Sequence, residues 1–185
     1  LTPQGYLVKN GDKLLIPTGR GIAACLDLEA DRFISHLYGN RTTTFHVSSI
    51  GNYIFHGGST YEMDAGKPYN LTAFYPVLTD DVVYFADHKW VVARDLHKPK
   101  IEKLIDRRGN EIIKTRLSLI WTVNNDKIFN VPETDYLKWL KTHPLRVDLK
   151  AGNRLYGHQD KSIFAVNLSA NGRNPKVSWT RTLEE

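Results

Sequence analysis

Short apolar runs alternate along the chain with short polar segments, and this pattern predicts strands joined by tight turns. The turn signals are Asn10-Gly11-Asp12, Gly51-Asn52, Thr79-Asp80-Asp81, Asn124-Asn125-Asp126 and Gly152-Asn153. Regular strands with such punctuation are typical of an all-β sandwich, barrel or propeller. One short helix is expected between Thr134 and Thr142, where Thr134 is a suitable cap and Pro144 would end the helix.

Internal repetition favours the propeller. Residues 80–96 and 152–168 both read as a polar turn, a strand containing Tyr84 or Tyr156, a second polar turn, and a strand ending in Ala-x-Asp/Asn-Leu. A third copy begins at Gly11, and weaker copies begin near residues 51 and 125. This spacing fits a unit of roughly 35 to 45 residues, the size of a four-stranded propeller blade.

The sequence therefore predicts an all-β fold, a β-propeller built of four-stranded antiparallel blades. Residues 1–185 would form one propeller module of about four to five blades, either a single domain or part of a larger ring. Because one blade cannot bury both of its faces, neighbouring blades must stack, and the apolar residues between them form the core. We expect Ala93 and Ala165 to allow close packing of the sheets, with Tyr84, Tyr156 and Trp179 as further packing residues.

Composition excludes several classes of protein. The chain has 185 residues, a net charge of +5 and a single cysteine, Cys25, so it has neither an internal disulfide nor a cysteine cluster for zinc. It has no apolar run long enough for a membrane-spanning helix. The sequence begins at Leu1 without a signal-peptide pattern, and we expect a processed chain or an excerpt.

Residues 152–168, followed by Val177-Ser178-Trp179, resemble the pyrroloquinoline-quinone-like repeats of quinoprotein alcohol dehydrogenase-like β-propellers. That resemblance implies a bacterial, periplasmic or secreted protein in which Trp179 packs between blades. Enzymes of this family hold a quinone above a vicinal disulfide, beside a calcium ion. The single Cys25 cannot form that disulfide, and no acidic and amide cluster is evident. We therefore expect no cofactor and no catalytic residue.

The candidate ligand-binding residues are Arg20, His56, His88 and His158. Each is expected in a turn between the second and third strands of a blade, on the face that carries the blade-to-blade connections. They would form a ring of cationic or metal-capable side chains. The plainer interpretation is that histidine is simply tolerated in an exposed turn.

A basic stretch runs from Arg94 to Arg116. It could dock an acidic partner, or it could be a solvated outer strand and loop. Nucleic acid is not favoured, because no aromatic residues are interleaved for base stacking. The four tryptophans could instead form a sugar-stacking platform: Trp90, Trp121, Trp139 and Trp179.

These observations favour a non-enzymatic scaffold or binding module. It would present one loop face to a protein partner, a small ligand or a glycan, or would join the remaining blades of a larger assembly. Two alternatives stay open. One is a fragment of a quinoprotein-like oxidoreductase that uses quinone and calcium, and the other is a carbohydrate-binding propeller.

Overall fold

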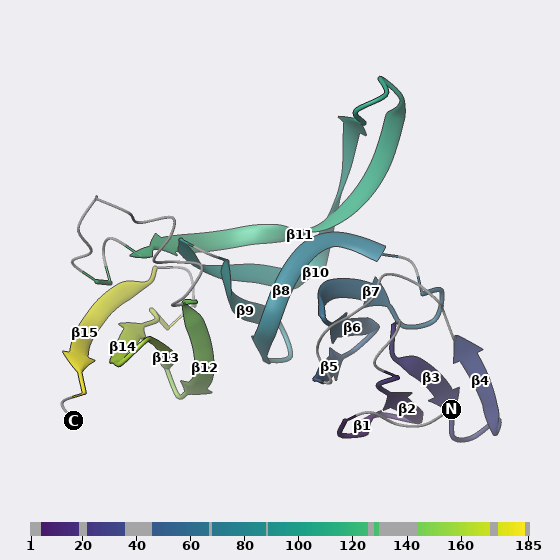
Figure 1. Cartoon of the computed structure of the whole chain (residues 1–185), viewed down its shortest axis with the longest axis horizontal. Coiled ribbons are helices and arrows are strands. Elements are labelled where there is room, and N and C mark those ends of the chain that lie inside the picture. The colour runs from purple at the N-terminus through teal and green to yellow at the C-terminus, as the bar shows by residue number, and fades with distance from the viewer. Residues whose placement is uncertain are drawn as a thin grey trace. The chain divides into compact units, whose positions relative to one another are not determined.

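The computed structural model describes residues 5–18, 22–35, 46–66, 68–87, 89–125, 128–129, 144–170 and 174–183 (Figure 1). The chain divides into two compact units. The first comprises Leu1–Phe74 and His97–Leu117, and the second comprises Tyr75–Leu96 and Ser118–Glu185. Each unit is described by itself below.

The first unit begins with a four-stranded antiparallel sheet in chain order. Its tight β1–β2 turn contains Gly11 at φ 60°, a left-handed conformation that glycine adopts without strain. The strands are β1 (Val8–Asn10), β2 (Lys13–Ile16), β3 (Ala24–Asp27) and β4 (Arg32–Ser35).

Seven further strands follow one another in a second antiparallel sheet. Its longest members, β8, β10 and β11, each contribute residues to both units. The division in β8 falls at Tyr75, whose φ of 49° is left-handed and breaks the regular alternation of the strand. The strands are β5 (Val47–Ile50), β6 (Tyr53–His56), β7 (Gly58–Glu62), β8 (Pro68–Leu78), β9 (Val82–Asp87), β10 (Trp90–Ile105) and β11 (Glu111–Asn124).

The last sheet belongs wholly to the second unit and is again a four-stranded antiparallel sheet in chain order. Gly152, at φ 55°, lies in the turn between its first two strands. The strands are β12 (Arg146–Ala151), β13 (Arg154–Gln159), β14 (Ser162–Asn167) and β15 (Lys176–Thr182).

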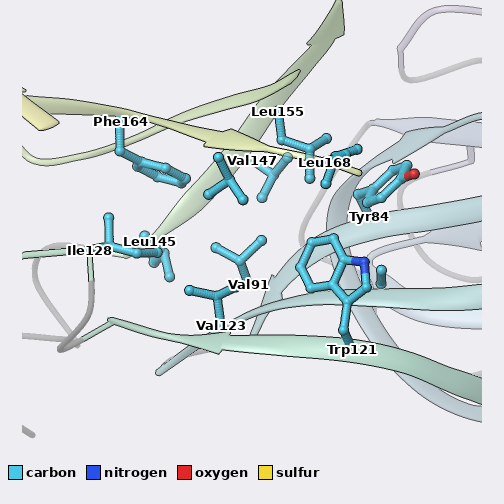
Figure 2. Close-up of a cluster of buried hydrophobic side chains, with 12 residues drawn as sticks. Tyr84, Val91, Trp121, Val123, Ile128, Leu145, Val147, Leu155, Phe164 and Leu168 are labelled. Carbon is cyan, nitrogen blue, oxygen red and sulfur yellow. The ribbon is translucent and has the colours of Figure 1, made fainter. Parts of the chain in front are cut away.

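Each unit has its own core between two stacked sheets. In the first unit, Leu15 and Cys25 of the β1–β4 sheet pack with Ile54 and Tyr61 of β6 and β7. In the second unit, Figure 2 shows Val91, Val123 and Trp121 of β10 and β11 facing Val147, Leu155 and Phe164 of β12–β14. The stacking that the sequence predicts is therefore present within each unit.

The predicted all-β class with antiparallel sheets is confirmed. Among the described strands, two sheets have the predicted four strands, and the sheet between them in the sequence has seven. No α-helix occurs among the residues the structure describes, and the helix expected at 134–142 lies outside them. The weak repeat near residue 125 begins no described strand, since β11 ends at Asn124. Within the same described residues, no helix is long and apolar enough to cross a membrane.

Candidate functional site

The structure describes only two of the four residues that the sequence suggested for ligand binding. Arg20 and His88 lie outside the described residues. His56 was expected in an exposed turn, but it ends strand β6 and is only 1% exposed. Its Nδ1 accepts a hydrogen bond of 3.1 Å from the amide of Ala23. The turn placement was wrong because Gly57 and Gly58, both at positive φ, take the turn instead.

His158 also lies on a strand, β13, rather than in a turn. It is half-buried, and its Nδ1–H donates to Asp148 Oδ2 at 2.6 Å. The role of Arg20, His88 and His158 in ligand binding stays a prediction, whereas the buried His56 is not available for it.

The single thiol, that of Cys25, is inaccessible to solvent. Cys25 is fully buried in the core of the first unit, and this burial raises the pKa of its thiol. A thiol with a raised pKa is protonated at neutral pH and is a poor nucleophile. Across the described ranges, no group of three or more His, Cys, Asp or Glu side chains is arranged to hold a metal ion.

An arrangement of one tyrosine, one alanine and one tryptophan occurs on the sheet that contains β9, β10 and β11. Tyr84 pairs with Ala93 across the strands, and the Tyr84 and Trp121 ring centroids are 6.0 Å apart. All three residues are buried. Burial, and to a smaller extent the charge of Asp81, raises the pKa of Tyr84.

The same arrangement recurs on the next sheet. Tyr156 pairs with Ala165, Ala165 pairs with Trp179, and the two rings lie 6.3 Å apart. Ala165 is fully buried. The alanine lies between the two aromatic residues in the strand register, so its small side chain leaves room for them to meet above it.

The two arrangements differ in what covers them. Tyr84, Ala93 and Trp121 belong to the core of the second unit, together with Val147, Leu155, Phe164 and Val166 of the following sheet. Tyr156, Ala165 and Trp179 are not part of that core, and 38% of Trp179 is exposed. Trp179 contacts Tyr156, and its expected packing between two blades stays a prediction.

Polar and charged residues extend this surface. Arg146 pairs with His158 across β12 and β13, and its guanidinium lies 4.5 Å from the centroid of the Tyr75 ring. Leu149, which is 54% exposed, pairs with Tyr156. Cross-strand partners point to the same side of a sheet, so these side chains share one surface. We call it the open face; it consists of Arg146, Leu149, Tyr156, His158, Ala165 and Trp179, and Tyr75 adjoins it through the Arg146 guanidinium.

The composition of the open face is typical of protein-binding hot spots, in which Trp, Tyr and Arg are enriched. The predicted four-tryptophan sugar platform has less support, because Trp121 is buried in the core and Trp139 lies outside the described residues. Trp90 and Trp179 are partly exposed.

The basic stretch forms a two-stranded segment, which we call the ribbon: residues 97–117, from β10 and β11. Its turn is held by Asp106, which accepts hydrogen bonds from the amides of Arg108 and Asn110 at 2.8 and 2.9 Å. These bonds, with that from the Asn110 side chain, lower the pKa of Asp106. The sequence predicted an outer strand and loop, and it missed the length of the hairpin. The missed signal was Asp106-x-x-Gly109-Asn110 between two alternating runs.

No family model and no curated protein sequence matches the chain. Among solved structures, the Cps50 (Swd1) β-propeller domain of Myceliophteria thermophila is similar, with a TM-score of 0.48 and 14% identity over 96% of this chain and 55% of that chain. The N-terminal domain of Nup159 has a TM-score of 0.44 and 12% identity, over 94% of this chain and 47% of that chain. BamB from Moraxella catarrhalis has a TM-score of 0.39 and 11% identity, over 96% of this chain and 63% of that chain. The chain spans less than two thirds of the length of each of these structures.

Proposed function

We propose that the chain is a non-enzymatic β-propeller module that binds a protein partner through the open face. One observation carries the proposal. The same Tyr-Ala-Trp arrangement occurs twice, once buried beneath a following sheet and once with its tryptophan exposed.

The buried copy indicates the kind of partner. Tyr84, Ala93 and Trp121 are covered by apolar side chains of a β-sheet, among them Leu155 and Val166. The open face has the same three residue types on three successive strands, with a similar distance between the two rings, so a sheet with an apolar Leu, Val or Phe face is the surface it fits best. Such a sheet could belong to a partner protein or to a further blade of a larger assembly.

The energetics favour binding through this face. A buried Tyr or Trp contributes on the order of 150–250 Å² of contact area, at about 25 cal/mol per Å² of apolar surface. Arg146 is already stacked on Tyr75, and Trp179 on Tyr156, so their side chains lose little conformational freedom when a partner docks. Pre-ordered aromatic and arginine side chains are the usual centre of a binding hot spot.

The proposal includes no quinone, calcium or other cofactor. Arg20, His88 and His158, three of the four residues that the sequence suggested for ligand binding, belong to it as a further contact for a ligand. Of these, His158 also lies on the open face, where its imidazole is hydrogen-bonded to Asp148.

Site-specific photo-crosslinking tests the proposal in cells that express the full chain. The photoreactive amino acid p-benzoylphenylalanine replaces Trp179 in one protein. In the matched control it replaces Leu119, which is also partly exposed (53%) and lies on β11 of the same unit. We expect position 179 to give a crosslinked band of defined mass that is identified by mass spectrometry.

Introducing Leu149→Asp should remove that band, because a carboxylate would then lie against the apolar partner surface. A band at twice the mass of the chain would identify the partner as a second copy. Equal crosslinking from positions 179 and 119, or a band that survives Leu149→Asp, would contradict the proposal.

A further inference from the structure

The ribbon carries most of the excess positive charge of the protein. Residues 97–117 contain seven Lys or Arg and three Asp or Glu, so four of the five net positive charges lie in this segment. The remainder of the chain is therefore close to neutral. Positive charge concentrated in one segment creates a local electrostatic potential that attracts acidic groups to that segment.

Two ion pairs define the faces of the ribbon. Lys103 Nζ lies 2.9 Å from Glu111 Oε1, and Arg116 Nη1 lies 3.7 Å from Glu102 Oε2. Neighbouring residues of a strand point to opposite sides, so these two pairs mark the two faces. By the same alternation, Ile101 and Ile105 share the face of Lys103, and Ile113 shares that of Glu111.

The face marked by the Lys103–Glu111 pair is exposed and apolar. Ile101, Ile105 and Ile113 are 74%, 78% and 66% exposed. Leu104 and Ile112 lie at intervening positions on the other face, and both are half-buried. Three large aliphatic side chains on one short surface are unusual for a solvated hairpin and are typical of a contact surface.

We propose that this isoleucine face docks an extended acidic polypeptide that carries apolar side chains. The aliphatic groups of the partner would cover the isoleucines, while its carboxylates would meet Arg107 and Arg108, which are exposed in the turn at the end of this face. This surface shares no residue with the open face, and the inference goes beyond the proposed function.

The arrangement of the ribbon favours a polypeptide over other polyanions. It contains no Phe, Tyr or Trp for base stacking, so a single-stranded nucleic acid would find only charge. Glu111 lies on the same face as the isoleucines, where its carboxylate would be costly to bury in a lipid surface. A polypeptide can supply carboxylates and apolar groups in alternation and leave the Lys103–Glu111 pair in place.

The edge of β10 is a poorer site than the face. The pairing of β10 with β9 ends at Asp95, and the next residues along β10 include Lys98, Pro99 and Lys100. Proline cannot donate a ladder hydrogen bond, and edge lysines discourage the addition of a strand. The partner is therefore expected to lie across the isoleucine face rather than to extend the sheet.

Fluorescence anisotropy with a synthetic probe tests the inference. The probe is a labelled peptide of about ten alternating Glu and Leu residues, which in extended form spans one strand of the ribbon. Comparison probes are a peptide of Glu and Ser, a single-stranded oligonucleotide, and vesicles of phosphatidylcholine with phosphatidylserine. We expect the Glu-Leu peptide to bind most tightly, and raising the salt concentration to weaken its binding.

Paired variants separate the apolar and charged contributions. The double variant Ile105→Ser, Ile113→Ser should weaken peptide binding about tenfold or more, whereas the exposed control Leu28→Ser should leave it unchanged. Replacing both Arg107 and Arg108 by Ser should weaken binding about threefold at low salt. The matched charge control is Lys9→Ser with Lys176→Ser, which removes two exposed lysines elsewhere.

Absence of Glu-Leu peptide binding, or peptide binding that is insensitive to the isoleucine variants, would overturn the inference. Tighter binding of the oligonucleotide or of the vesicles, with the same dependence on the variants, would replace the polypeptide by that partner. Trp179→Ala should not affect peptide binding to the ribbon, so failure of this inference is distinguishable from failure of the proposed function.

Discussion

Trp121 and Trp179 each contact a tyrosine two strands away, but only Trp121 is covered by a following sheet. Replacing each tryptophan by alanine therefore measures how much that covering sheet contributes to stability. Trp121 is 6% exposed within the core of the second unit. Truncation of a fully buried tryptophan costs about 3–5 kcal/mol, of which part is lost transfer free energy and part is the cavity left behind. Trp121→Ala is therefore expected to lower the free energy of unfolding by about that amount.

Trp179→Ala should cost much less. With 38% of its surface exposed, Trp179 buries about two thirds of the area that Trp121 buries. Water can enter the space that the indole vacates, so no closed cavity remains. The expected loss is about 1–2 kcal/mol, mainly from contact with Tyr156 and Ala165.

Urea unfolding of the two variants, followed by far-ultraviolet circular dichroism, provides the measurement. Both variants should shift the transition midpoint with little change in slope, which indicates altered stability rather than an altered unfolded state. The reasoning would be refuted if Trp179→Ala destabilised the dilute protein as much as Trp121→Ala does. Equal losses would mean that the open face is already covered.

Three other predictions concern His56, Gly58 and Asp106. His56→Leu removes the acceptor of the buried Ala23 amide and should cost about 1–3 kcal/mol in urea unfolding; an unchanged midpoint would show that water replaces the imidazole. Gly58→Ala should destabilise the first unit by about 1 kcal/mol or more, because Gly58 has φ +81° and a Cβ would overlap the Phe74 ring. Combining it with Phe74→Ala should recover part of the loss, and full additivity would disprove the overlap. The Asp106 turn should be intact at neutral pH and open as the pH falls below about 4, because the lowered pKa means that protonation opposes folding. Amide exchange in the turn measures this, and Asp106→Ala should show weak protection at every pH.

The sequence predicted the sheets well because their signals are local. Turns at Gly11, Gly51 and Gly152 join strands where the pattern places them, and each of these glycines has positive φ. The two strong repeats became the β9–β10 and β13–β14 pairs, with Ala93 opposite Tyr84 and Ala165 opposite Tyr156. Two-residue periodicity and turn chemistry suffice for such predictions.

The candidate site was harder to predict because exposure depends on which sheet follows. Tyr156 and Trp179 look the same in sequence as their buried counterparts, and only the structure shows that Trp179 is partly exposed. His56 seemed a surface residue because it precedes two glycines, yet its ring is needed inside to accept the Ala23 amide. The contact between Arg146 and Tyr75 joins distant parts of the chain and has no local signal.

The alanine beneath each pair of aromatic side chains also limits which substitutions can accumulate during evolution. A larger side chain at position 93 or 165 would push the neighbouring indole and phenol apart. In related chains, a bulkier residue there should accordingly be accompanied by a smaller one at the tyrosine or tryptophan position. The three positions of each sheet are thus expected to vary together as a set.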